Sequence, residues 1–194
     1  MRVTKMHDVT SPAGIRRCMN AVRFPHTLLW ASIPCTGGSP WQHYNKQFPN
    51  AQRMIKEHKA LFRKIWRTFE ATAEECIACG GTVAIEWPRQ CTYWTNLSVQ
   101  RFMSRHGLER VHFDGCMFNL ISIRTGKPIK KPWSVATNNQ HIRNALAGRM
   151  CDGSHEHTPC AGKDTQRTEG YTEDMVKCIH KAFKAQAKQK HKQK

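Results

Sequence analysis

The sequence predicts an α/β protein whose mostly parallel sheet is flanked by helices and ends in a hairpin. Three apolar segments of strand length, at residues 27–33, 82–87 and 108–118, are separated by segments with helical spacing of apolar residues. This alternation favours parallel strands joined by right-handed helical crossovers. The 194 residues are enough for one domain with a substantial core.

The first half of the chain begins with a capped helix. Ser11 offers the hydroxyl of a helix N-cap, and Pro12 suits the first turn, so a helix is expected to end before Pro25. Residues 27–33 are apolar on both faces, which is typical of a central parallel strand. The next expected elements are a loop, a long helix, a strand and another helix, at 40–49, 51–76, 82–87 and 93–106.

The long helix is expected to bury one face and to present cations on the others. The residues near helical spacing, expected to be buried, are Met54, Leu61, Ile65, Phe69 and Thr72. The cations on its other faces are Arg53, Lys56, Lys59, Arg63, Lys64 and Arg67.

The second half is expected to be less regular. Residues 121–124 and 133–136 flank a Thr-Gly-Lys-Pro turn and predict a hairpin, and a short helix is expected at 139–149. A last helix over 172–187 is expected to give way to an unfolded lysine tail. The expected divisions are an α/β domain, a Cys/His-rich loop, and a helix with a basic tail, at 1–149, 150–171 and 172–194.

The charge of the chain points to a polyanionic partner. Lys and Arg number 31 against 14 acidic residues, which gives a net charge of +17. Phosphates attract such a surface over long range, so nucleic acid is the expected partner, and a solvated surface without a partner is the alternative. No apolar run has the length of a membrane helix, and no signal peptide is recognised. Nine cysteines without framework spacing fit reduced thiols, so an intracellular location, nuclear or cytoplasmic, is expected.

Candidate contacts with nucleic acid are spread along the chain. In addition to the cations of the long helix, the candidate phosphate-binding residues are Lys127, Lys130, Lys131, Lys184 and Lys188. Aromatic residues that could stack on bases are Trp41, Tyr44, Trp94 and Trp133. Aromatic residues at such positions also fit a hydrophobic core, and the lysines also fit a solvated terminus.

Two strands end in residues that carry chemistry. The strand at 27–33 is followed by Pro34 and Cys35, and the strand at 82–87 contains Glu86 just before a proline. If the strands are parallel neighbours, both side chains lie at the edge of the sheet where open α/β proteins bind ligands. The alternatives are an ordinary thiol and a structural carboxylate.

These motifs, in this order, resemble the second half of the DNA (cytosine-5) methyltransferases of phages and mobile elements. In that family one strand ends in Pro-Cys and the next in Glu-Asn-Val or Glu-Asn-Pro. Residues 114–118 and 126–133 are similar to later strands of those proteins. The resemblance covers about residues 8–140. It implies a partial Rossmann-like methyltransferase fold, with Cys35 attacking the pyrimidine ring and Glu86 protonating it.

The departures from the family concern its cofactor. The glycine-rich loop that holds S-adenosylmethionine would lie before Asp8, where the chain has seven residues, and Trp87 replaces the family's asparagine. We therefore expect a truncated, catalytically inactive relative that binds nucleic acid and does not bind S-adenosylmethionine alone. Any remaining activity would resemble that of a DNA cytosine methyltransferase. The alternatives are an active half completed by another chain, and a small zinc-binding nucleic-acid module.

A short segment of the second half is rich in metal ligands. Two thiols and two imidazoles, the ligand types of structural zinc, lie at Cys151, His155, His157 and Cys160. The spacing is tighter than in ordinary zinc fingers, so Cys116 or Cys178 could complete a site with a subset of these residues. A polar loop without metal is the alternative.

The missing cofactor strand has a structural consequence. Without it, the apolar strand at 27–33 is expected to form an open edge of the sheet. We therefore expect self-association, or pairing with a partner chain, through this strand.

Overall fold

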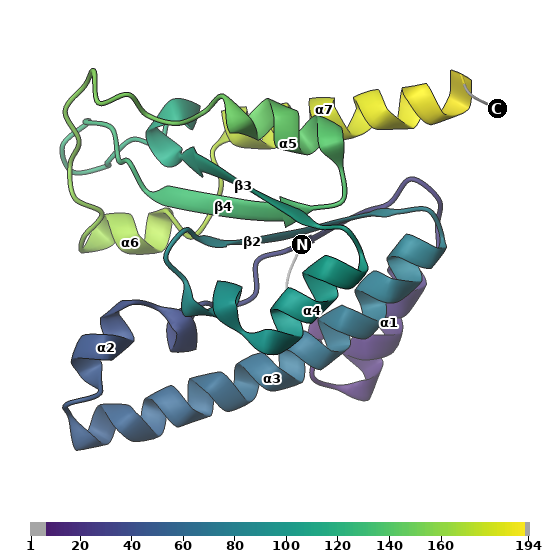
Figure 1. The fold of residues 1–194 in the computed structure, drawn as a ribbon. Coiled ribbons are helices and arrows are strands. Elements are labelled where there is room, and N and C mark those ends of the chain that lie inside the picture. Colours follow the sequence, from purple (N-terminus) through teal and green to yellow (C-terminus); the bar gives the residue numbers. More distant parts are fainter. Residues whose placement is uncertain (1–6, 193–194) are drawn as a thin grey trace. The chain divides into compact units, whose positions relative to one another are not determined.

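The computed structural model describes residues 7–192 and confirms the α/β class (Figure 1). The chain divides into two compact units, residues 1–108 and 109–194, which are called unit 1 and unit 2 below. Unit 1 contains a parallel pair of strands and unit 2 an antiparallel pair. The strands are therefore mixed rather than mostly parallel. Within the described residues, no helix is long and apolar enough to cross a membrane.

Unit 1 is organised around two parallel strands, β1 (Leu28–Ala31) and β2 (Thr82–Pro88). Leu28 lies opposite Thr82 and Ala31 opposite Ile85, so the two strands predicted from the sequence are parallel neighbours. The α-helices of the unit are α1 (Pro12–Val22), α2 (Trp41–Asn45), α3 (Pro49–Ala78) and α4 (Leu97–Arg105). Two 3₁₀ turns complete it, η2 (Thr36–Gly38) and η3 (Thr92–Thr95).

The first helix begins where the sequence predicts. The hydroxyl of Ser11 accepts a 3.0 Å hydrogen bond from the backbone N–H of Gly14, and Pro12 is the first helical residue. A side chain in this position satisfies one of the N–H groups that the first turn of a helix leaves unpaired. Helix α1 then packs against α3.

The buried face of α3 agrees only in part with the expected one, because Phe69 and Thr72 are buried as predicted and Ile65 is half-buried. Met54 and Leu61 are 55% and 44% exposed, while their neighbours Ile55 and Phe62 are buried. The buried residues of α3 are Ile55, Phe62, Trp66, Phe69, Thr72, Ala73 and Cys76. The aromatic rings decide the rotation of the helix, because Phe62 stacks on Tyr93 at 3.7 Å and Trp66 contacts Phe102 edge-on.

Unit 2 contains two antiparallel strands, β3 (Glu109–Asp114) and β4 (Pro132–Thr137), with Glu109 opposite Thr137. Its helices are α5 (Gln140–Ala147), α6 (Lys163–Arg167), α7 (Glu173–Lys192) and the 3₁₀ turn η4 (Gly115–Phe118). Helix α5 packs on both strands and α7 packs on α5. Helix α7 continues to Lys192, so the residues of the expected unfolded tail are helical up to Lys192, and the last two lie outside the described residues. The Ala, Gln and Lys residues of this tail favour a helix.

The predicted hairpin between residues 121–124 and 133–136 is wrong. The first segment forms only an isolated bridge from Ile121 to Pro128, and β4 pairs with β3 instead. The physical reason is a carboxylate. Asp164 accepts hydrogen bonds from the backbone N–H of Ile123 at 2.9 Å and the hydroxyl of Ser122 at 2.7 Å, so this segment is bound by α6.

Candidate functional site

The metal-ligand candidates are brought together by the end of β3. Asp114, the last residue of β3, accepts a 3.0 Å hydrogen bond from the backbone N–H of Cys151. Its own N–H donates to the carbonyl oxygen of Arg149 at 2.9 Å. Because Asp114 is followed directly by η4, these two bonds place Cys151 beside Cys116.

Four side chains form a compact cluster in unit 2: Cys116, Cys151, His155 and His157. One ligand atom of each lies within 4.8 Å of the others. Cys151 Sγ is 3.8 Å from Nε2 of His155 and 3.5 Å from Nε2 of His157, which is 3.4 Å from Cys116 Sγ. A tetrahedral ion with metal–sulfur bonds of about 2.3 Å and metal–nitrogen bonds of about 2.0–2.1 Å would separate sulfur and nitrogen by about 3.6 Å. These side chains could therefore hold a metal such as zinc.

Cys160, the fourth ligand expected from the sequence, lies outside this cluster. It is exposed, and its Sγ lies 3.2 Å from the hydroxyl of Thr168. Cys116 takes its place, as one of the two completing cysteines that the sequence suggests. The other, Cys178, contacts the carbonyl oxygen of Ala145 instead.

The cluster places two thiols close together in a partly buried environment. Burial raises the pKa of Cys116 to about 11, and the nearby Cys151 and Asp114 act in the same direction. The thiol of Cys116 therefore keeps its proton at neutral pH until a cation is bound. A metal ion would supply the positive charge that two thiolates require.

Cys35 and Glu86 lie at the same end of the parallel strand pair. Glu86 is the residue after Ile85, which lies opposite the last residue of β1, and Cys35 follows β1 and precedes η2. Glu86 is buried and Cys35 is half-buried. Burial raises the pKa of Tyr93 to about 12, and the thiols of Cys91 and Cys35 near it contribute to the shift.

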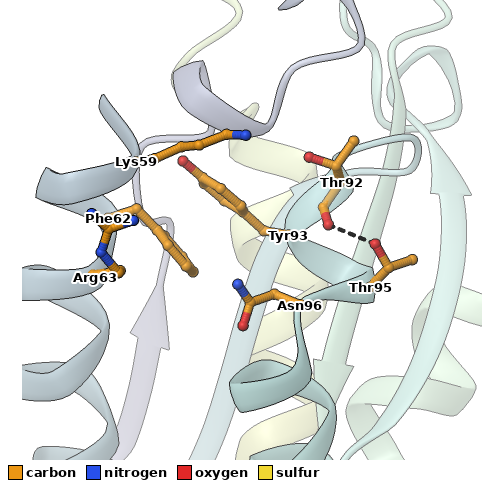
Figure 2. A pocket seen from close by; sticks show the side chains of 7 residues that line it. All are labelled: Lys59, Phe62, Arg63, Thr92, Tyr93, Thr95 and Asn96. Carbon is orange, nitrogen blue, oxygen red and sulfur yellow. Dashed lines mark hydrogen bonds between the residues drawn. The ribbon is translucent and has the colours of Figure 1, made fainter. Parts of the chain in front are cut away.

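A pocket of about 220 Å³ opens beside this region of unit 1 (Figure 2). Figure 2 shows Lys59 and Arg63 on one side of it, and Thr92, Thr95 and Asn96 on the other. The remaining lining residues are Phe62 and Tyr93. Two cations line this pocket and make it suited to an anionic group. From the sequence, only these cations were identified, as members of the basic helix.

The predicted stacking residues separate into two classes. Trp94 and Trp133 are each 2% exposed and belong to the cores of their units, so they cannot stack on bases. Trp41 and Tyr44 are 75% and 60% exposed on α2, which the sequence assigned to a loop. Phe48, just before α3, is also exposed and was not identified as a stacking candidate.

The predicted phosphate-binding lysines also differ. Lys131 donates a hydrogen bond to the carbonyl oxygen of Thr168 and lies over the ring of Trp133, so it has a structural role. Lys127 forms an exposed ion pair with Glu156. Lys130 and Lys184 are exposed, and the backbone of Lys188 is in α7.

Comparison of the chain with protein-family models, with curated proteins and with solved structures found no significant match. The resemblance to methyltransferases therefore depends on the motifs of the sequence alone.

Proposed function

We propose that this chain is a nucleic-acid-binding protein whose unit 2 contains a structural zinc site. The observation that supports this best is the cluster of Cys116, Cys151, His155 and His157, with its ligand atoms within 4.8 Å of one another. Four protein ligands fill a tetrahedral shell and leave no position for a reacting water, which is the arrangement of structural zinc. Zinc would link the irregular segment after α5 to the end of β3.

Metal analysis of the purified chain and its variants tests the zinc site. We expect about one zinc ion per chain, in agreement with the single four-ligand cluster found among the described residues. Cys116→Ser and Cys151→Ser should lose the metal and lower the melting temperature, because bound zinc stabilises only the folded state. Cys160→Ser is the matched control and should keep the metal. Zinc loss in Cys160→Ser with retention in Cys116→Ser would refute this ligand set.

Nucleic-acid binding is supported by the net charge of +17, since 31 Lys and Arg residues stand against 14 acidic residues. Helix α3 carries part of this excess on exposed positions, including Lys56, Lys59 and Arg63, while its opposite face is buried. Anisotropy titrations with labelled DNA and RNA at several salt concentrations test the proposal. Binding should weaken steeply between 50 and 200 mM salt, by about 10³-fold if six phosphates are contacted. Affinity that is independent of salt would exclude a phosphate-driven mode.

A second candidate function is supported by the register of β1 and β2, which places Cys35 and Glu86 at one end of the strand pair. By its resemblance to cytosine methyltransferases, the chain would be an active half completed by another chain, with Cys35 as nucleophile. Such a thiol needs a lowered pKa. The alkylation rate of the Cys35 peptide, measured by mass spectrometry at several pH values, tests this. A titration near the ordinary thiol pKa of about 8.5 would remove the candidate.

A further inference from the structure

We infer that an exposed aromatic surface on unit 1 binds single-stranded nucleic acid by stacking on its bases, an inference that rests on the proposed function. The surface consists of Trp41 and Tyr44 on α2 and Phe48 before α3, and is called the aromatic platform below. These side chains are 75%, 60% and 47% exposed. Trp41 and Tyr44 lie three residues apart on α2, and Tyr44 contacts Phe48, so these exposed rings are a candidate interaction site.

Side-chain hydrogen bonds to the backbone hold the segment of the aromatic platform in place. The side chain of Gln42 donates a 2.8 Å hydrogen bond to the carbonyl oxygen of Thr36, and that of Gln52 donates a 3.0 Å bond to the backbone carbonyl oxygen of Lys46. Tyr44 and Phe48 contact each other edge-on, with their ring centroids 5.6 Å apart. The rings of Tyr44 and Phe48 are thus partly ordered before a ligand arrives, which lowers the entropy lost on binding.

The charge around the aromatic platform favours a polyanion. From residue 41 to residue 67 the chain has a single acidic residue, Glu57, which pairs with Arg53 at 3.0 Å. The cations of the same stretch are Lys46, Arg53, Lys56, Lys59, Arg63, Lys64 and Arg67. Lys59 and Arg63 lie one helical turn apart at the pocket of Figure 2, where their two positive charges could contact a phosphate. A second copy of this chain would bring like charges together here.

The exposed rings favour single strands over duplexes. Bases in a duplex are stacked on each other, whereas single strands offer their ring faces to aromatic side chains. Combining stacking rings with nearby cations is the general design of proteins that bind single strands without sequence preference. The aromatic platform has both components on one segment of unit 1.

Titration of wild-type and variant chains with a labelled single-stranded oligonucleotide, and with the matching duplex, tests the inference. Trp41→Ala should weaken single-strand binding about 5- to 150-fold, because one base–aromatic stack is worth about 1–3 kcal/mol. Duplex binding should be unchanged, and so should the salt dependence. Lys56→Gln should instead lower the slope of log affinity against log salt by about 0.7 for single strands.

Phe24→Ala provides the matched control. Phe24 is an aromatic residue that is 66% exposed, next to Arg23, which bonds Glu75 near the opposite end of α3. This variant should bind single strands like the wild type. Both substituted side chains are exposed, and circular dichroism melts would verify that both variants fold.

The outcomes separate the inference from the proposed function. If the wild type binds nucleic acid with a steep salt dependence and Trp41→Ala binds single strands equally well, the aromatic platform is refuted and nucleic-acid binding stands. If the wild type binds neither form, both proposals fail. If light scattering shows a wild-type oligomer that Trp41→Ala dissociates, the surface contacts a second copy and the inference is overturned.

Discussion

The indole nitrogen of Trp87 donates a 2.7 Å hydrogen bond to the backbone carbonyl oxygen of Ile33. Trp87 is in β2 and is 1% exposed, and Ile33 follows β1. The bond therefore joins the carboxyl ends of the two parallel strands. Ile33 lies two residues before Cys35, and Trp87 directly follows Glu86. Trp87 therefore has a structural role in unit 1.

Replacing Trp87 with phenylalanine should destabilise unit 1. The substitution removes the donor and leaves the carbonyl oxygen of Ile33, a residue 6% exposed, without this partner. An unsatisfied buried acceptor costs about 1–3 kcal/mol, and the smaller ring adds a cavity. Urea unfolding measures the loss. Trp41→Phe, at a position 75% exposed, should change the unfolding free energy by less than about 0.5 kcal/mol. Equal stability of the two variants would contradict the structural role.

The glycines after Cys35 are explained by close packing. A β-carbon at Gly37 would lie 2.5 Å from the hydroxyl oxygen of Tyr93 and 3.1 Å from the β-carbon of His58. One at Gly38 would lie 2.9 Å from the ring of Tyr93. Turn η2 thus packs against α3 and η3 so tightly that a side chain has no room at either position.

Gly37→Ala should therefore destabilise the chain by about 1–3 kcal/mol through overpacking. The hydroxyl of Tyr93 is buried without a hydrogen-bond partner among the described residues, so Tyr93→Phe alone should be nearly neutral. Combining the two substitutions should recover part of the loss, because the closest clash is removed. A double-mutant cycle in urea measures this coupling. Strict additivity would show that the hydroxyl does not limit the space at Gly37.

The strands of unit 1 could be predicted because local signals determine them. The apolar run before Pro34 and the glycines before Thr82 mark two strands, and the cap at Ser11 marks the first helix. The parallel pairing followed from the long helix between the strands. In each case the residues that decide the structure lie within the element or at its ends.

The rest depended on contacts between distant segments. Cys116 joins the metal cluster because Asp114 binds the backbone of Cys151, a bond that no spacing in the sequence indicates. Asp164 binds the segment around Ile123 and prevents the expected hairpin. Leu61 and Phe62 are both apolar, so only the aromatic partners of Phe62 reveal which of them is buried. These contacts, and the choice of which side chain is buried, arise from tertiary packing, which local sequence patterns do not encode.

Strand β1 should support self-association. It pairs with β2 on one side, its four residues are only half-buried, and it is an edge strand among the described residues. An apolar edge strand can pair with another chain, and a lysine there disfavours pairing. Sedimentation velocity should show association that grows with concentration in the wild type and is reduced in Leu29→Lys. Leu97→Lys, at an exposed position of α4, is the control and should associate like the wild type. A wild type that stays monomeric at all concentrations would refute this expectation.

Asp164 should make the stability of unit 2 depend on pH. Its side chain is fully buried and accepts hydrogen bonds from Ser122, Ile123 and Arg124. The bond from the Ser122 hydroxyl, followed by those from the Ile123 backbone and Arg124, lowers the pKa of Asp164 below its ordinary value of 3.8. Because the folded state favours the ionised form, the stabilisation is fully present above the unfolded pKa and is lost as the pH falls through the lower, folded pKa.

Asp164→Asn should therefore melt at a lower temperature than the wild type at pH 7, because it loses the charge and one of the two acceptor oxygens. The gap between the two proteins should narrow as the pH falls below the ordinary pKa of 3.8, because the carboxylate of the unfolded chain takes up its proton first and that of the folded chain only at lower pH. Thermal melts of both proteins from pH 7 to pH 2.5 measure the difference in melting temperature. The other carboxylates are the same in both proteins, so their effect cancels in this difference. Glu57→Gln, an exposed acid on α3 of unit 1, should show no gap of this kind. A gap that stays constant over the whole range would mean that hydrogen bonding without charge accounts for the role of Asp164.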